Sequence, residues 1–250
     1  MHSLSLGAYV LAGGRSTRMG QDKALLPLAG RPLVEHAVSK LRHLTDEVNI
    51  LADRTELAAF APIVPDLRQG CGPLGGFETA LSHTRREWVL ILPVDMPFVP
   101  VALLQSWVHS VLDRRKVRAA LFVIDQVPQP ALCLLHREML PFIAAAVLQG
   151  RFKLYPVIEE AARALAHQHS TSPNEVLLLH PWSGSATSFS FIDREEGKHL
   201  ESLTQAQQSA KHLWFANLNT PEEFREAQLH LDALDAWVEP SPSTGRPMQQ

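Results

Sequence analysis

Cysteine is scarce in this sequence of 250 residues, which argues against a Cys-x-x-Cys metal or redox protein and against a disulfide-stabilised one. The two cysteines, Cys71 and Cys133, lack the Cys-x-x-Cys spacing of a metal or redox motif and are too few for a disulfide framework. We interpret Cys71 as a bystander thiol in its loop. This cysteine usage fits a reducing compartment, so we expect a cytoplasmic protein.

Long apolar runs and an excess of positive charge are also absent. No apolar run reaches the roughly 18 residues that span a bilayer, so we expect no membrane span. The first residues lack a charged segment followed by an apolar one, so we expect no signal peptide. The net charge is −3, which argues against nonspecific binding to nucleic acid or to a membrane surface.

The sequence has the composition of an ordinary globular protein, with 46% hydrophobic and 20% charged residues. Short apolar segments typical of strands alternate along the chain with segments whose apolar residues have helical spacing. This alternation predicts an α/β layered fold. We expect one domain over residues 1–238, with an irregular insertion at about 167–212 and a disordered tail at 239–250. Expected strands cover 8–12, 47–51, 63–65, 88–92, 119–124, 131–135 and 213–216, with a strand-like 176–179 inside the insertion. Expected helices cover 32–44, 77–84, 101–113, 137–149, 155–166 and 220–237.

The stretch from 10 to 23 combines flexible backbone with positive charge. An apolar run ends at Gly13 and Gly14, and Arg15, Arg18 and Lys23 follow. Glycine lets the backbone turn sharply and bring N–H groups close to a ligand, and cations complete what a polyphosphate needs. The spacing matches neither the Rossmann motif nor the Walker A loop. A turn with solvated charges is the alternative for the glycine pair taken alone.

Two acidic residues follow expected strands further along the chain. Asp66 comes after 63–65, and Asp95 comes after the apolar run 88–92. Ligands of open α/β sheets bind beyond the carboxyl ends of the strands, where both acids should lie with the glycine pair. Asp95 is well placed to hold a metal ion; a helix N-cap is the alternative. A second glycine-rich loop, 70–76, precedes the expected helix at 77–84. By contrast, we interpret His167 and His169 as surface residues, because no third metal ligand has suitable spacing.

Four segments together resemble the molybdenum cofactor guanylyltransferases of the nucleotidyltransferase superfamily. They are Leu11-Ala12-Gly13-Gly14-Arg15-Ser16-x-Arg18-Met19-Gly20-x-Asp22-Lys23, Gly72-Pro73-Leu74-Gly75-Gly76, Asp95-Met96-Pro97-Phe98-Val99 and Asn217-x-Asn219-Thr220-Pro221-Glu222-Glu223. The resemblance covers about residues 7–160 and 213–230. It implies a Rossmann-like three-layer α/β/α sandwich with a mostly parallel mixed sheet, as in the nucleotide-diphospho-sugar transferases.

The resemblance also implies an activity: transfer of GMP from GTP to the phosphate of molybdopterin, with release of pyrophosphate. Lys23 and the first loop would hold the triphosphate, Arg18 would neutralise the departing pyrophosphate, and Asp95 would bind Mg²⁺. These three residues are the expected catalytic group. The expected binding residues are Leu11, Ala12, Gly13, Gly14, Lys23, Asp53, Asp66, Gly75 and Asp95. Molybdoenzymes or other proteins of cofactor synthesis are expected partners.

The sequence departs from the family pattern in three places, all of which concern the base or the pterin. The strand end near the base reads Leu51-Ala52-Asp53-Arg54 where the family is often rich in Asn, so Asp53 would accept hydrogen bonds from guanine. Gln129-Pro130 stands where His-Pro is common. The stretch 167–212 is longer than usual. The alternatives are a cytidylyltransferase, another small-phosphate nucleotidyltransferase, and a non-catalytic factor that binds the cofactor.

Overall fold

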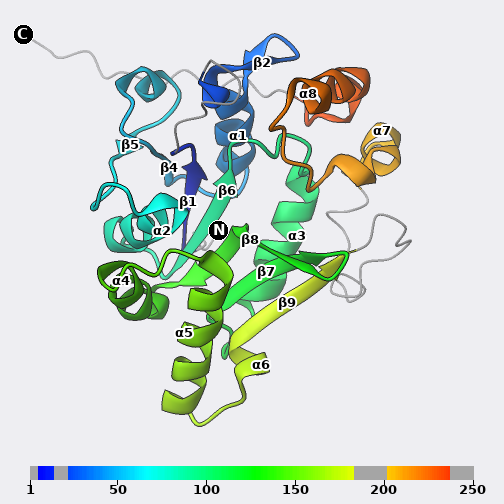
Figure 1. Ribbon diagram of the computed structural model, residues 1–250. Helices are drawn as coiled ribbons and strands as arrows, with labels where there is room; N and C mark the ends of the chain where they lie inside the picture. The colour runs from blue at the N-terminus through cyan, green and yellow to red at the C-terminus, as the bar shows by residue number, and fades with distance from the viewer. Residues whose placement is uncertain (1–4, 14–21, 183–201, 237–250) are drawn as a thin grey trace, which may run out of the picture.

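The computed structural model describes residues 5–13, 22–182 and 202–236. Its centre is a seven-stranded sheet with the order β5-β4-β1-β6-β8-β7-β9 (Figure 1). Six strands run in one direction, and β8 runs antiparallel to both of its neighbours. The strands are β1 (Leu6–Leu11), β4 (Val48–Leu51), β5 (Ile63–Val64), β6 (Trp88–Pro93), β7 (Ala119–Ile124), β8 (Val127–His136) and β9 (Leu177–Trp182). The expected mostly parallel mixed sheet is confirmed.

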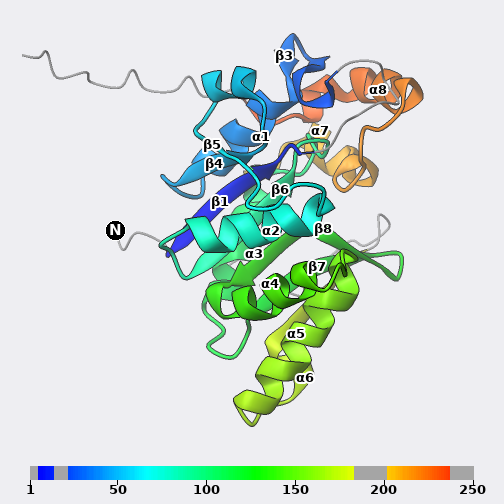
Figure 2. The same cartoon turned by 60° about the vertical axis from the view of Figure 1, so that its left-hand side comes forward.

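Helices cover both faces of the sheet and produce the expected three layers (Figure 2). Side chains of β6 alternate between the two cores. Leu90 packs on one face with α1 (Leu33–Arg42) and α3 (Val101–Leu112), and Ile91 packs on the other with α2 (Gly72–His83), α4 (Leu140–Leu148) and α5 (Leu154–Gln168). This double burial explains the continuous apolar run of β6. The helices are α1 (Leu33–Arg42), α2 (Gly72–His83), α3 (Val101–Leu112), α4 (Leu140–Leu148), α5 (Leu154–Gln168), α6 (Pro173–Val176), α7 (Gln205–Ser209) and α8 (Pro221–Ala227).

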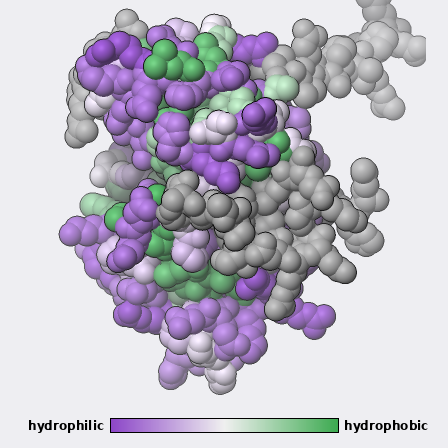
Figure 3. All heavy atoms as spheres, turned by 90° about the vertical axis from the view of Figure 1, so that its right-hand side faces the viewer, coloured by the Kyte–Doolittle hydropathy of each residue, from purple (hydrophilic) through white to green (hydrophobic). Residues whose placement is uncertain are grey.

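The smaller elements lie around this frame. A two-stranded hairpin, β2 (Pro27–Leu28) and β3 (Arg31–Pro32), precedes α1. Short 3-10 helices are η2 (Lys23–Leu25), η3 (Thr55–Ala59), η4 (Arg137–Met139), η6 (Lys211–Leu213) and η7 (Gln228–Ala233). On the side of β9, α7 and α8, hydrophilic side chains predominate at the surface (Figure 3). In the part of the chain that the structure describes, no helix is both long and apolar enough to cross a membrane.

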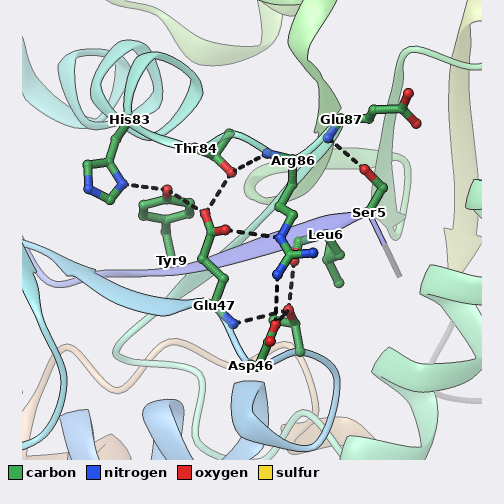
Figure 4. Close-up of polar contacts among 10 residues, drawn as sticks. Ser5, Leu6, Tyr9, Asp46, Glu47, His83, Thr84, Arg86 and Glu87 are labelled. Atoms are coloured by element: carbon green, nitrogen blue, oxygen red, sulfur yellow. Dashed lines mark hydrogen bonds and ion pairs between the residues drawn. The ribbon is translucent and has the colours of Figure 1, made fainter. Parts of the chain in front are cut away.

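The amino ends of the strands are held by a polar network away from the expected site (Figure 4). The Tyr9 hydroxyl lies 2.9 Å from Nδ1 of His83 and 3.4 Å from Oε1 of Glu47. Arg86 donates a hydrogen bond of 3.1 Å to Glu47 and makes an ion pair with Asp46. Burial, followed by the charge of Glu47, raises the pKa of the Tyr9 hydroxyl, which therefore stays protonated. The network joins β1 and β4 to the end of α2.

The second glycine segment differs from its prediction. Residues 72–76 do not form a loop before a helix at 77, because α2 already begins at Gly72. Pro73 sits in the first turn, where its fixed backbone angle favours a helix and its missing N–H costs nothing. Gly72 has a φ of +57°, which glycine adopts without strain. A glycine-rich sequence thus forms the start of a helix rather than a flexible turn.

Residues 167–212 are more regular than expected in their described part. The stretch contains α6, and β9 pairs in parallel with β7 as an edge strand of the main sheet. Leu177 is buried and Leu178 packs against the core, whereas Leu179 is exposed, so β9 forms a partly buried edge of the sheet. His167 and His169 are exposed as expected, and Nε2 of His169 lies 2.8 Å from Glu138.

Two further predictions near the carboxyl end are wrong. Residues 213–216 form no strand: Leu213 ends η6, and Trp214 and Phe215 are also buried. The side chains of these three residues all pack into the same core from irregular backbone, whereas a strand would direct every second one to the opposite face. The expected helix 220–237 is shorter, because α8 ends at Ala227 and η7 is kinked at His230. Its start is confirmed, with Thr220 and Glu223 forming a capping box. The expected tail, 239–250, lies outside the described residues.

Candidate active site

Several of the expected site residues that the structure describes lie at the carboxyl ends of β1, β4, β5 and β6. In this sheet, Leu11 ends β1 and pairs with Pro93 of β6 on one side and Leu51 of β4 on the other. Because the strands are parallel, the residues that follow them meet at one edge. Gly13, Asp53, Asp66 and Asp95 all lie in these continuations.

A cavity of about 690 Å³ opens at this edge between the strand ends and the start of α2. That volume suits a small organic ligand such as a nucleoside. The cavity is lined by Leu11, Gly13, Leu51, Ala52, Asp53, Arg54, Asp66, Gln69, Gly70, Gly72, Pro73 and Gly76. The structure therefore brings together Leu11, Gly13, Asp53 and Asp66 from the predicted set.

The two acids in the cavity are close enough to influence each other. The Asp66 amide donates a hydrogen bond of 3.3 Å to Oδ1 of Asp53, and Gln69 donates one of 2.9 Å to Oδ2. The Asp53 carboxylate is thus oriented by both contacts. Burial raises the pKa of Asp66, and the charge of Asp53 raises it further. The cavity therefore presents a negative, hydrogen-bond-accepting wall.

Two glycines of α2, Gly75 and Gly76, have different surroundings. Gly76 lines the cavity, and a Cβ there would lie 3.1 Å from Leu11 Cδ1. Gly75, a predicted binding residue, lies against Cys71, because a Cβ at this position would lie 2.8 Å from the Cys71 Cβ. Gly75 is therefore needed for packing of the first turn of α2, and Gly76 keeps the cavity open. Ala12 is buried and does not line the cavity.

A second group of polar residues lies on the other side of β1, at the end of β6. Lys23 Nζ lies 2.6 Å from Asp95 Oδ2 and 2.6 Å from Asn219 Oδ1. The Lys23 and Asp95 side chains are only 13% and 19% exposed, which strengthens their ion pair relative to one at the surface. The Asp95 carbonyl also accepts a 3.0 Å hydrogen bond from the Leu218 amide, which brings Asn219 to the site. The predicted meeting of Lys23 and Asp95 is observed.

This second group has the donor chemistry for a divalent cation. The Lys23 ammonium occupies a position between a carboxylate oxygen and an amide oxygen, and such oxygens also bind Mg²⁺. Among the residues that the structure describes, no group of three His, Cys, Asp or Glu side chains could hold a metal by itself. A metal here would need oxygen ligands from a substrate, as is usual for Mg²⁺ bound with nucleotides.

A family model for the MobA-like NTP transferase domain matches residues 8–170, which include the cavity, Lys23 and Asp95. The chain belongs to this family. The matched region ends before Asn219, so the third member of the polar group comes from outside the family domain. Gly14 and Arg18, two further predicted site residues, lie within the match but outside the described residues.

Two relatives of the chain are named molybdenum cofactor guanylyltransferase. The chain is 35% identical over 155 residues to a molybdenum cofactor guanylyltransferase of Vibrio cholerae, covering 60% of this chain and 75% of that protein. It is also 35% identical over 174 residues to a protein of the same name from Serratia proteamaculans, covering 66% of this chain and 85% of the other.

Solved structures support the fold. The molybdopterin-guanine dinucleotide biosynthesis protein A of Archaeoglobus fulgidus superposes with a TM-score of 0.62 at 22% identity, covering 89% of this chain and 97% of that one. A putative glucose-1-phosphate thymidylyltransferase of Bacillus anthracis gives a TM-score of 0.64 at 12% identity, covering 93% and 98%. At these identities the likeness establishes the nucleotidyltransferase fold.

Three residues at the site were not predicted to act there. Asn219 belongs to a segment that the resemblance identified, but no sequence pattern places it against Lys23. Gln69 and Arg54 line the cavity and contact Asp53 and Asp22, respectively. The sequence position of Arg54 indicated that it lies near the site, since it follows directly after Asp53, which is expected to bind the base.

Proposed function

We propose that this protein transfers GMP from GTP to the phosphate of molybdopterin, forming the guanine dinucleotide cofactor and pyrophosphate. The observation that carries the proposal is the group of Lys23, Asp95 and Asn219 beside a cavity of nucleoside size. The names of relatives at 35% identity point to the same reaction. The reaction class follows from the site, and the substrates follow from the relatives.

The chemistry requires no nucleophilic side chain. A phosphate oxygen of molybdopterin attacks the α-phosphorus of GTP, the bond from this phosphorus to the bridging oxygen breaks, and pyrophosphate leaves with that oxygen. The protein must hold both substrates in line and stabilise the negative charge that develops on the leaving group. We propose that Lys23 and backbone amides from Gly13 onward bind the triphosphate. Arg18 is proposed to neutralise the departing pyrophosphate.

The acidic wall of the cavity favours guanine over cytosine. The pairing edge of guanine carries two adjacent N–H donors, whereas that of cytosine carries one donor and two acceptors. A carboxylate accepts two parallel hydrogen bonds, so Asp53 matches guanine and would repel the acceptors of cytosine. Asp66 adds a second acceptor near it. This complementarity supports GTP as the nucleotide.

Magnesium is proposed to bind at Asp95, with Asn219 as a further oxygen donor. A cation held by these two residues would supply positive charge that offsets the negative charge of the GTP phosphates. Lys23, which pairs with Asp95 in this structure, would then be available to bind the triphosphate. We propose that the protein works in the cytoplasm and delivers its product to molybdoenzymes or to other proteins of cofactor synthesis.

The direct test is to incubate the protein with molybdopterin, Mg²⁺ and either GTP or CTP, and to measure pyrophosphate and the dinucleotide. The proposal predicts both products with GTP and little with CTP. Product with CTP alone would identify a cytidylyltransferase. Product with sugar phosphates in place of molybdopterin would identify another small-phosphate nucleotidyltransferase.

A non-catalytic factor that binds the cofactor remains the second candidate. The departure at Gln129-Pro130 and the long stretch 167–212 favour it, because both concern the acceptor side. This candidate predicts binding of molybdopterin without turnover and no effect of Asp95→Ala on that binding. The intact pairing of Lys23 with Asp95 favours catalysis.

A further inference from the structure

Arg54 connects the two described ends of the first glycine segment. Its guanidinium donates a hydrogen bond to the carbonyl oxygen of Ala12 and forms an ion pair with the carboxylate of Asp22. Ala12 comes directly before Gly13, and Asp22 comes directly before Lys23. One side chain from the loop after β4 thus holds both sides of the segment that is proposed to bind the triphosphate.

Asp22 transmits this contact to Lys23. While Oδ2 of Asp22 pairs with Arg54, Oδ1 accepts a 3.0 Å hydrogen bond from the Ala24 amide and caps η2. Lys23 is the first residue of that helix, so the orientation of the cap determines where the Lys23 side chain leaves the backbone. From there Lys23 reaches Asp95.

The chemistry of the guanidinium suits this role. A planar guanidinium presents several N–H donors at fixed angles, so Arg54 contacts a carbonyl and a carboxylate at the same time. Asp22 neutralises its charge, so Arg54 contributes little net charge to the site. We infer that Arg54 is a positioning residue that clamps Ala12 to Asp22 and thereby sets the distance between the Gly13 backbone and Lys23. The identity of the nucleotide in the tests rests on the proposed function.

The first test is a kinetic comparison of Arg54→Gln and Asp22→Asn with the wild type. Asparagine still caps η2 but loses the ion pair, so both variants remove the clamp and leave the cap. We expect the KM for GTP to rise about tenfold in each, with kcat changed by less than about threefold, because the clamp preorganises binding. Arg54→Lys should restore part of the loss, since an ammonium reaches one acceptor well but not both.

Arg86→Gln is the matched control. Arg86 is as exposed as Arg54, with 28% of each side chain accessible, and it also pairs with carboxylates (Figure 4). These contacts lie at the amino ends of the strands, whereas Arg54 lies at the carboxyl ends. We expect this variant to lower the melting temperature without changing the KM for GTP. A rise in KM in Arg86→Gln equal to that in Arg54→Gln would show a general loss of stability and overturn the inference.

The double variant Arg54→Gln/Asp22→Asn separates the clamp from direct phosphate binding. A clamp predicts that the double variant binds GTP no worse than either single variant, because each already breaks the same contact. If Arg54 bound phosphate itself, Asp22→Asn would remove a neighbouring negative charge and tighten GTP binding. Tighter binding in Asp22→Asn would therefore overturn the inference.

Hydrogen exchange without nucleotide provides a readout that does not depend on the reaction. The amides of Ala24, Leu25 and Leu26 are hydrogen-bonded within η2 or to its cap. We expect them to exchange about tenfold faster in Arg54→Gln, and at the wild-type rate in Arg86→Gln. Unchanged exchange in Arg54→Gln would contradict the clamp. If the wild type did not turn over GTP, the proposed function would fail, and this exchange would still decide the inference.

Discussion

Asp66 shows the conflict between stability and function at the scale of a single residue. Burial and the nearby charge of Asp53 raise the pKa of this carboxyl, so its ionised form is less favourable in the folded protein than in the unfolded chain. Ionised Asp66 therefore costs stability at neutral pH. Such a cost is typical of a group retained for binding, and here the carboxyl faces the cavity.

We predict that Asp66→Asn stabilises the unliganded protein at pH 7. The gain should shrink as the pH falls toward about 4, because the wild-type carboxyl then binds a proton in both the folded and the unfolded state. Thermal unfolding of both proteins between these pH values measures the difference. The exposed Asp232→Asn is the control and should change the melting temperature little. A wild type more stable than Asp66→Asn at pH 7 would contradict the assigned cause of the pKa shift.

Asp53 is predicted to select the base. Its carboxylate is oriented by the Asp66 amide and Gln69, so it can meet two guanine donors without reorganising. Asp53→Asn replaces one acceptor by a donor, and we expect the KM for GTP to rise about tenfold, the value of a charge-assisted hydrogen bond. The KM for CTP should fall or stay the same. An equal rise for both nucleotides would show that Asp53 supports the loop and does not read the base.

At the scale of elements, the carboxyl-terminal segment 202–236 is fastened to α1 and α3 by one carboxylate. Asp235 forms an ion pair with Lys40 of α1, whose side chain is only 3% exposed. Oδ1 of Asp235 also accepts hydrogen bonds of 3.1 Å from the Val101 amide and 3.0 Å from Gln207. The same segment carries Asn219, which contacts Lys23. The ion pair of Asp235 with Lys40 therefore helps to hold Asn219 at the site.

We predict that Asp235→Asn lowers the free energy of unfolding by about 3 kcal/mol, because it leaves the Lys40 ammonium buried without a counter-charge. Denaturant unfolding at neutral pH measures this. Asp232→Asn changes the same charge three residues earlier, at an exposed position, and should cost less than about 0.5 kcal/mol. Equal effects of the two variants would mean that the ion pair with Lys40 contributes nothing specific.

The sequence was most informative about elements with local or periodic signals. The buried run of β6 and the capping box at Thr220 depend on neighbouring residues, and both predictions are confirmed. The start of α2 was misread, because Gly75 and Gly76 suggest a loop by composition although packing against Cys71 and Leu11 requires small residues in a helix. Local patterns do not reveal such tertiary constraints.

At the scale of the whole molecule, topology decided how much of the site could be predicted. Acids after parallel strands must meet at one edge, which placed Asp66 and Asp95 correctly in advance. The contact of Lys23 with Asn219 joins residues 196 positions apart through the docking of the last segment, and no strand order predicts it. The position of Arg54 next to Asp53 indicated a place near the site, but its contacts could not be predicted, because both of its partners belong to other segments.

The ion pair between Lys23 and Asp95, which are 72 positions apart in the sequence, is the central structural feature of the proposed reaction. We expect Lys23→Ala and Asp95→Asn each to retain the fold, because both side chains lie at the edge of the core and neither is fully buried. Each should nevertheless remove interactions made with the transition state. Lys116→Ala is the control, since Lys116 pairs with Glu175 at an exposed position outside the site.

The most direct measurement is the rate of pyrophosphate release from GTP with Mg²⁺ and molybdopterin, compared among the wild type, Lys23→Ala, Asp95→Asn and Lys116→Ala. We predict a loss of roughly a hundredfold or more in the first two variants, about 3 kcal/mol of transition-state stabilisation, and no loss in Lys116→Ala. Release at the wild-type rate by folded Lys23→Ala and Asp95→Asn would contradict the account.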